Sequence, residues 1–435
     1  MKNKLIKSTI ILLIGGFISK ILGMITKIAL TRSVTTTGIG IYMLVLPTFN
    51  LFITLCTLGL PTAISKLVSE KKNNNKKIVL SMIPTIILFN ILLMLILFLI
   101  APIISNILLK NNLTYYPIMA IGLTLPFICI SSIIRGYFFG KEKMIPHTVS
   151  IIFEQIIRLL LTIFFIPNLL KYSLTFAITG VVLINIISEL SSIIILMLFL
   201  PRNVKITKKD FKLDKCIAKD MLNISIPTTG SRLIGSITYF FEPIILTFAL
   251  SYIGYSNDFI TTEYGIINGY VFPLILLPSF FTLAISNALL PIISNNYSNK
   301  RYNYAYKKIK QACIYSLIIG IPITICLILI PEFFLKLVYG TTLGSNYIKI
   351  VAPFFLLFYI QAPLTSSLQA MGKADIAMRG TLYGSFIRTF ILFALSLLHI
   401  GIWGLIIATI SNVIFVTLHH LYCIKKIFKK KTIYP

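Results

Sequence analysis

The sequence has few charged residues and very few acids. Only 12% of its 435 residues are charged, and Asp and Glu together number 12 against 40 Lys and Arg. Because 57% of the residues are hydrophobic and the mean hydropathy is +0.92, too little polar surface remains to cover a water-soluble globule. We therefore predict an all-α, polytopic membrane protein.

Cysteine and histidine are also scarce, which argues against disulfides and metal sites. The six cysteines are isolated and form no CxxC pair, so we interpret them as small core residues. The four histidines show no metal-ligand spacing with acids, and we expect the adjacent His419 and His420 to be exposed at a helix end. We therefore expect no metal and no resident cofactor.

Apolar runs long enough to span about 30 Å of hydrocarbon occur twelve times. They lie near residues 8–30, 39–64, 79–101, 115–138, 147–169, 174–200, 222–250, 264–291, 313–331, 348–369, 380–399 and 402–423. The sequence thus predicts about twelve transmembrane helices in two six-helix lobes. The loops expected outside the cell are too small and too poor in catalytic side chains for a sugar-polymer ligase or polymerase, so we expect no enzyme.

Lys and Arg concentrate in alternate gaps between these runs. The basic gaps lie at residues 66–77, 135–143, 202–219, 300–310 and 373–379. Since cytoplasmic loops retain positive charge, we assign these gaps, Arg135 included, to the cytoplasm and place both termini there. The net charge of +28 is then explained by an anionic inner leaflet, and we expect no nucleic-acid partner.

A hydrophilic stretch and an internal repeat divide the chain. We predict an N-lobe at 1–200, a basic cytoplasmic linker at 201–220, a C-lobe at 221–424 and a basic cytoplasmic tail at 425–435. The segment GKEKMIPHTVSIIFEQIIR, which ends at Arg158, resembles GKADIAMRGTLYGSFIR, which ends at Arg388, if small gaps are allowed. Parallel repeats of this kind predict a substrate site between the halves near the membrane midplane.

Basic side chains also occur inside the first predicted span, where a cation costs roughly 2.5 to 3.5 kcal/mol. Gly16, Lys20, Gly23 and Lys27 recur at helical spacing and so share one face. We predict that both lysines face a cavity. The alternative for Lys27 is that its long stem reaches the outer interface.

Later spans contain further ionisable residues. Glu154 precedes Arg158 by one turn, a spacing suited to an ion pair that either lines a cavity or only neutralises itself while bridging helices. Glu189 lies on a polar stripe whose simpler explanation is hydrogen bonding between helices. Arg232 and Glu242 lie about 80° apart around one helix, where they could line one cavity at different depths.

The basic residues inside the spans outnumber the acids, which favours an anionic ligand. Arg388 follows Gly380 and Gly384 at four-residue steps and adds a cation in the second half. Arginine forks match phosphate oxygens and lysines add point charge, so a diphosphate head group is the expected ligand. A lipid-linked diphosphate sugar would need such a polar interior to cross hydrocarbon.

Several of these segments resemble one known family. FISKILGMITKIALTR, GIGIYMLVLPTFNLFITLCTLGLPTAISKLVSEK, GYFFGKEKM, SIIFEQIIRLLL and LLPSFFTLAISNALLPIIS are similar to the stage V sporulation protein B and polysaccharide transporter family. That family belongs to the multidrug/oligosaccharidyl-lipid/polysaccharide (MOP) flippase superfamily, which includes the lipid II flippases. The resemblance implies a MATE-like, V-shaped pair of six-helix lobes that works by alternating access around a central cavity.

The resemblance also implies a function and a set of residues. It implies export of an undecaprenyl-diphosphate-linked sugar precursor, for peptidoglycan, spore cortex or polysaccharide, across the bacterial cytoplasmic membrane by a monomer. The expected substrate-binding residues are Lys20, Lys27, Lys66, Arg158, Arg232 and Arg388, of which Lys66 enters through the resemblance alone. The expected ion-coupling or charge-pairing residues are Glu154, Glu189 and Glu242, with Na⁺ or H⁺ as the coupling ion.

Two alternatives stay open at this point. Lipid II flippases have two further helices that form a groove for the lipid tail, whereas this sequence ends after the twelfth run with KKIFKKKTIYP. We therefore expect either a shorter member of the family or a different path for the tail. The alternative function is a multidrug or organic-cation antiporter of the same superfamily, which would need acids facing the cavity.

Overall fold

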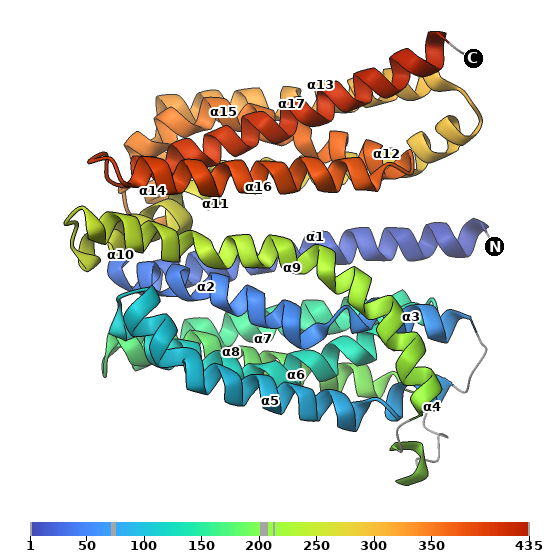
Figure 1. The fold of residues 1–435 in the computed structure, drawn as a ribbon, viewed down its shortest axis with the longest axis horizontal. Helices are drawn as coiled ribbons and strands as arrows, with labels where there is room; N and C mark the ends of the chain where they lie inside the picture. The colour runs from blue at the N-terminus through green and yellow to red at the C-terminus, as the bar shows by residue number, and fades with distance from the viewer. Residues whose placement is uncertain (1, 71–74, 201–207, 212–213, 434–435) are drawn as a thin grey trace. The chain divides into compact units, whose positions relative to one another are not determined.

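A computed structural model describes residues 2–70, 75–200, 208–211 and 214–433. Every regular element within these ranges is a helix (Figure 1). In chain order the elements are α1 (Lys2–Ser33), α2 (Thr36–Thr57), α3 (Leu60–Ser69), α4 (Asn75–Leu80), α5 (Ile83–Pro102), η1 (Ile103–Leu108), η2 (Asn112–Thr114), α6 (Tyr115–Gly140), α7 (Met144–Leu170), α8 (Leu174–Leu198), η3 (Lys208–Phe211), α9 (Lys215–Tyr252), α10 (Asn257–Gly265), η4 (Ile266–Val271), α11 (Phe272–Ile275), α12 (Ser279–Ser298), α13 (Tyr302–Leu329), α14 (Pro331–Tyr339), α15 (Ser345–Ala370), α16 (Ala374–Ser396) and α17 (Trp403–Ile433). The predicted all-α class is confirmed.

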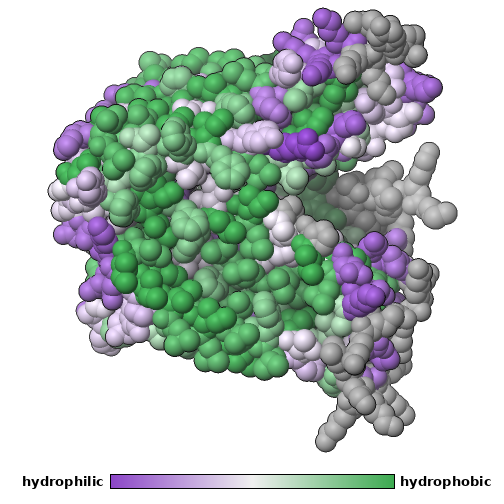
Figure 2. Space-filling view, viewed as in Figure 1, coloured by the Kyte–Doolittle hydropathy of each residue, from purple (hydrophilic) through white to green (hydrophobic). Residues whose placement is uncertain are grey.

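Most of these helices are suited to a membrane. In the described part of the chain, ten helical segments are long and apolar enough to span it, and the bent pair 257–275 and 279–298 makes up to one more. The helix α16 occupies the place of the eleventh predicted span but is not apolar enough to be counted, since it carries Asp375, Arg379 and Arg388. Figure 2 shows apolar residues over the middle of the helices and hydrophilic ones gathered toward their ends. The chain is a multi-pass membrane protein.

Two of the predicted continuous spans are broken. The run predicted at 39–64 forms α2 and α3, because Leu58 and Gly59 adopt left-handed backbone with φ of 42° and 63°. The run predicted at 264–291 forms η4, α11 and α12, which follow α10. The segment 257–275 and α12 are bent by 52° at a break that contains Pro278. Proline lacks the N–H that would continue the helical ladder at that point.

The described chain divides into two compact units, residues 1–244 and 245–435. Their boundary falls inside α9 and not within the predicted linker at 201–220. Residues 201–207 and 212–213 of that linker lie outside the described part of the chain. The predicted lobe limits therefore stay a prediction.

In unit 1 (residues 1–244), α6 is the central helix. It packs against α2, α3, α5 and α8, while α7 packs against α1 and α8. Two glycines let α3 approach α6 closely: a Cβ on Gly136 would lie 2.8 Å from the Pro61 carbonyl oxygen, and one on Gly140 2.6 Å from that of Ser65. Close backbone approach of this kind is how membrane helices gain packing energy without a hydrophobic driving force.

In unit 2 (residues 245–435), α15 takes the corresponding central place. It packs against α12, α13 and α17, and α16 packs against α17. The Tyr359 ring lies against Gly320 of α13, and its hydroxyl donates to the Ile275 carbonyl oxygen at 2.6 Å. Tyr359 is fully buried, so this bond satisfies a polar group that hydrocarbon would otherwise leave unpaired.

The α6–α7 and α15–α16 pairs have matching turns. The Lys143 N–H donates to Phe138 at 3.0 Å and the Lys373 N–H to Leu368 at 2.8 Å, five residues back in each case. Glu142 and Gly372 both have left-handed backbone, with φ of 56° and 72°. Since α7 begins at Met144 and α16 at Ala374, Arg158 and Arg388 both lie 14 residues beyond the first residue of their helix (158 − 144 = 388 − 374 = 14). The matching turns support the predicted repeat, and they align Glu142 with Gly372 and Arg158 with Arg388 without a gap.

The Gly140 contact yields a stability prediction. Gly140→Ala should lower the stability of the folded protein by about 1 to 3 kcal/mol, because the new Cβ meets backbone of α3 that has no space to yield. The measurement is the thermal unfolding midpoint in detergent. Gly16→Ala is the matched control, because within unit 1 no neighbouring atom lies within 4 Å of its Cβ position. Equal midpoints for the two variants would contradict the proposed α3–α6 contact.

Candidate functional site

Four charged side chains from three helices meet inside unit 1. Arg135 of α6 contacts Glu154 of α7 with Nη2 2.5 Å from Oε2, and Glu189 of α8 with Nη2 3.6 Å from Oε2. Arg158 of α7 contacts the other oxygen of Glu154, with Nη2 2.6 Å from Oε1. We call these four residues the charge cluster.

The two carboxylates of the charge cluster are buried and its two arginines are half-buried, so two formal positive charges face two formal negative charges. Glu154 and Glu189 are only 5% and 6% exposed. Removing such ions from water costs several kcal/mol each, and only close pairing with opposite charge offsets that cost. Arg135 adds a hydrogen bond from Nη2 to the Ser192 hydroxyl of α8 at 2.7 Å. The cluster therefore joins α6, α7 and α8 by electrostatic contacts within a largely apolar bundle.

The hydrogen bonding of the charge cluster is incomplete. Arg135 Nε, Arg158 Nε and Glu189 Oε2 are buried and make no hydrogen bond within the described ranges. Buried groups of this kind are uncommon and call for a specific role, such as a water, an ion or an alternative pairing. Both oxygens of Glu154 accept hydrogen bonds from arginine, whereas Glu189 Oε2 accepts none in the described chain.

The predicted Glu154–Arg158 ion pair is confirmed, but the prediction for Arg135 was wrong. The sequence placed Arg135 in a cytoplasmic gap, whereas α6 continues to Gly140 and keeps this side chain inside the helical bundle. The sequence did indicate that Arg135 lies in a helix, because the predicted apolar run 115–138 includes this position. The acids that Arg135 neutralises lie 19 and 54 residues further along the chain (154 − 135 and 189 − 135), so local spacing gave no indication of the pairing.

The two lysines of α1 occupy different environments. Gly15 lies against Thr148 of α7 and Gly23 against Gln155, so α1 and α7 run parallel with offsets of 133 and 132 residues. The same offsets place Lys27, which is half-buried, at the level of Leu159 and Leu160, the two residues that follow Arg158. Lys20 is exposed, and within unit 1 no neighbouring atom lies within 4 Å of the Cβ position of Gly16, one turn earlier.

The remaining predicted residues of unit 1 do not join the charge cluster. Lys66 is exposed on α3, and Arg232 is exposed on α9 between Gly230 and Gly235, whose Cβ positions have no neighbouring atom within 4 Å in the described chain. Glu242 is 4% exposed further along α9. Arg232 is therefore exposed and Glu242 buried, at positions ten residues apart on α9.

In unit 2 the corresponding positions are chemically different. The offset of 230 residues at the matching turns aligns Arg158 with Arg388, Glu154 with Gly384 and Arg135 with Thr365. A Cβ on Gly384 would lie 2.4 Å from Val416 and 3.5 Å from the Asn412 amide nitrogen of α17, so no space for a carboxylate side chain remains at this position. Arg388 is half-buried on α16. The repeat therefore preserves the second arginine but not the carboxylate beside it.

In unit 2 a network of hydrogen bonds between neutral groups joins α15, α16 and α17. Gln361 Nε2 of α15 donates to the Val413 carbonyl at 3.0 Å and to the Thr417 hydroxyl at 2.9 Å. His420 lies between helices, with Nδ1 3.3 Å from the Thr365 hydroxyl and Nε2 3.3 Å from the Ala377 carbonyl. The expected exposure of His420 was wrong: its ring is fully buried, because it satisfies polar groups of α15 and α16.

Family models and curated relatives match most of the chain. The polysaccharide biosynthesis protein model matches residues 5–297, and the MatE model matches residues 233–394. Stage V sporulation protein B of Bacillus subtilis (strain 168) is 34% identical, over 98% of this chain and 84% of that protein. Lipid II flippase MurJ of the same organism is 24% identical, over 89% of this chain and 76% of that protein.

Solved structures share the fold. An inward-facing multidrug resistance MATE family transporter of the MOP superfamily superimposes with a TM-score of 0.77, at 14% sequence identity, over 96% of both chains. At that identity the likeness concerns the fold alone. The predicted MATE-like fold is confirmed, while the roles predicted for individual residues stay predictions.

The charge cluster yields a second stability prediction. Glu154→Gln should lower the free energy of unfolding by about 1 to 3 kcal/mol, because it leaves the half-buried Arg135 and Arg158 with less opposite charge beside them. Glu154→Gln combined with Arg158→Gln should cost less than the sum of the single changes. The measurement is a double-mutant cycle of unfolding in detergent. Glu332→Gln, at an exposed position of α14, is the control, and strict additivity would contradict the coupling.

Proposed function

Because this chain belongs to the polysaccharide biosynthesis protein family, and to that of stage V sporulation protein B, we propose that it is a lipid-linked sugar flippase. It exports an undecaprenyl-diphosphate-linked sugar precursor across the bacterial cytoplasmic membrane by alternating access. The precursor serves peptidoglycan, spore cortex or polysaccharide synthesis. The protein acts as a monomer with both termini in the cytoplasm.

The observation that carries this proposal is the position of Lys20. The apolar segment of α1 covers residues 11–33, so Lys20 lies nine residues from one end and thirteen from the other, about 14 and 20 Å along the axis. That is close to the middle of a hydrocarbon layer about 30 Å thick. An exposed ammonium at this depth is expensive in lipid. Its exposure supports a water-filled passage along α1.

The exposed cations of unit 1 suit an anion. Arg232 is exposed on α9, with open space beside the neighbouring glycines Gly230 and Gly235. Glu154 and Glu189 already contact Arg135, which limits their power to neutralise the lysines of α1. A diphosphate would be held by lysine point charges and by the donor fork of arginine.

We propose that export is driven by the membrane potential and by binding of H⁺ or Na⁺ to the acids of unit 1. Glu189 has a buried oxygen without a hydrogen bond in the described chain, which supports it as an acceptor of H⁺ or Na⁺ that alters its contact with Arg135. Glu154 is held by two arginines and serves charge pairing. Glu242, buried on α9, is the second candidate for ion coupling.

The alternative function is an organic-cation antiporter, which the match to the MatE model favours. Such a transporter needs carboxylates that can face a cationic cargo. In unit 1, two of the three candidate acids lie within 4 Å of an arginine nitrogen, so the charge balance supports an anionic cargo more strongly. Substrate-driven uptake of Na⁺ or H⁺ with an organic cation would favour the antiporter instead.

The proposal predicts that Lys20 and Arg232 are needed for transport but not for folding. Lys20→Gln and Arg232→Gln should each slow flipping about tenfold or more, since a charge-assisted hydrogen bond contributes about 1.5 to 3 kcal/mol. Lys20→Arg should retain most activity. The measurement is accessibility of a lipid-linked diphosphate sugar in proteoliposomes, with the unfolding midpoint as the control for folding. Normal flipping by both Gln variants would refute the assigned cargo site.

Membrane potential should drive export even without an ion gradient. An inside-negative potential favours the outward movement of negative charge, and for about two charges the gain is roughly 4 to 5 kcal/mol per 100 mV. A potassium diffusion potential imposed with valinomycin should therefore increase outward accumulation of the lipid-linked sugar, and reversing its sign should reduce it. If only a Na⁺ or H⁺ gradient has this effect, net movement of negative charge is not the driving step.

A further inference from the structure

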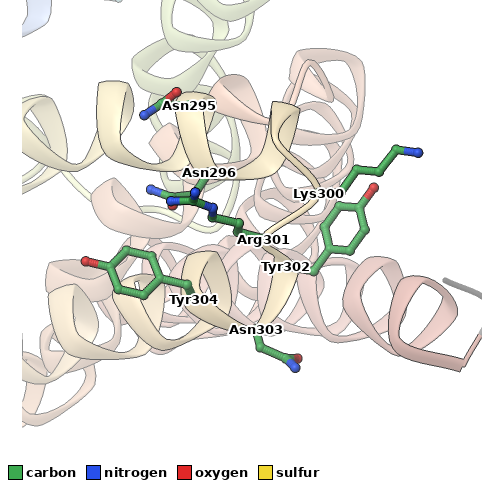
Figure 3. A pocket seen from close by; sticks show the side chains of 7 residues that line it. All are labelled: Asn295, Asn296, Lys300, Arg301, Tyr302, Asn303 and Tyr304. Atoms are coloured by element: carbon green, nitrogen blue, oxygen red, sulfur yellow. The ribbon is translucent and has the colours of Figure 1, made fainter.

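Unit 2 contains a polar cavity at the turn between α12 and α13 that the proposed function does not use. The cavity has a volume of about 550 Å³ and is lined by Asn295, Asn296, Lys300, Arg301, Tyr302, Asn303 and Tyr304. This size falls within the range of small-molecule sites, about 300 to 1,000 Å³. Figure 3 shows the Arg301 side chain extending toward Asn296, with Tyr304 on the same side, while Lys300 leaves the turn beside Tyr302.

The charge around this cavity is of one sign. Its lining contains two cations and no acid, and the sequence has neither Asp nor Glu anywhere between Glu263 and Glu332. The end of α17 that packs here is also basic: Phe428 lies against Tyr297 and Tyr306, with ring centroids 6.2 and 5.2 Å apart, and Lys425 and Lys426 precede it. An anion entering the cavity therefore meets no nearby carboxylate from these segments.

The hydrogen-bond donors of the cavity suit oxygen acceptors. Three asparagine amides and two tyrosine hydroxyls line it in addition to the cations. The helix α13 begins at Tyr302, and no side chain caps its first turn, so backbone N–H groups are available at the same place. Phosphate offers several charged oxygens and matches this combination of a guanidinium, an ammonium and neutral donors.

The backbone of the turn places a lysine where glycine is favoured. Lys300 has φ of 58°, in the left-handed region, and the turn is closed by a hydrogen bond from the Arg301 N–H to the Asn296 carbonyl at 2.8 Å. Glycine would adopt this conformation without the steric cost that a side chain brings. Lys300 therefore carries a steric cost that glycine at the same position would avoid.

We propose that this cavity is a binding site for the phosphate of an anionic lipid head group. The aromatic residues beside it have an apolar body and a polar tip, which suits the boundary between head groups and hydrocarbon. Arg301 contacts the phosphate beside Asn296, and Lys300 adds charge from the other side of the turn. The site lies wholly within unit 2 and does not depend on the proposed transport cargo.

The test measures binding of phosphatidylglycerol, phosphatidylcholine and inorganic phosphate to the full-length protein by native mass spectrometry and by thermal stabilisation. Phosphatidylglycerol should bind and stabilise, phosphatidylcholine should bind much more weakly, and inorganic phosphate should compete at high concentration. Phosphatidylcholine binding as tightly as phosphatidylglycerol would overturn the proposal. Competition by phosphate identifies the phosphate group as the feature recognised, whereas stabilisation by phosphate alone would show that the lipid is not the ligand and would also overturn it.

Two variants separate the cavity from general positive charge. Arg301→Gln and Lys300→Gly should each weaken phosphatidylglycerol binding roughly tenfold, as expected for loss of one charge-assisted contact. Lys300→Gly also relieves the left-handed backbone, so its unfolding midpoint should not fall. Lys310→Gln, at an exposed position of α13 outside the cavity, should bind like the wild type. Equal losses in all three variants, or none in Arg301→Gln and Lys300→Gly, would overturn the proposal.

Discussion

The cost of charge in hydrocarbon is the constraint on which the rest of this structure depends. A buried ion must find a partner, a cavity or an interface. Arg135, Glu154, Arg158 and Glu189 solve the problem by pairing, and in doing so they bring α6, α7 and α8 together. Lys20 is exposed at mid-depth, and the proposed passage along α1 would supply the water that its charge needs. Charge therefore determines both the packing and the proposed cargo path.

The two repeats have similar backbones but surround their equivalent arginines with different side chains. Their α6–α7 and α15–α16 turns have equivalent hydrogen bonds, and Arg158 and Arg388 stand at equivalent positions. Unit 1 balances its arginine with a carboxylate, whereas unit 2 has glycine at the corresponding position and a neutral network around His420. A duplicated scaffold has thus diverged into an electrostatic half and a hydrogen-bonded half.

The sequence was sufficient for features that depend on local pattern. Hydropathy predicted the membrane class, and one-turn spacing predicted the Glu154–Arg158 pair, because both are set by residues that are close along the chain. It was insufficient where distant segments meet. Arg135 resembled a loop cation because its two acids lie on other helices, and His420 resembled an interface residue because its partners lie on α15 and α16. The break after Leu58 was missed since it depends on left-handed backbone that hydropathy does not record.

The length of α9 has a mechanical consequence. Its 38 residues extend about 57 Å, and the boundary between the two compact units falls within it. A continuous helix transmits torque, so a rotation of one unit must either turn this rod or be absorbed by bending it. Figure 1 shows that α9 is not straight, and Gly230 and Gly235 give it a segment with little side-chain bulk to resist flexing. Arg232 lies within that segment, so an anion held there would be coupled directly to the strain of the rod.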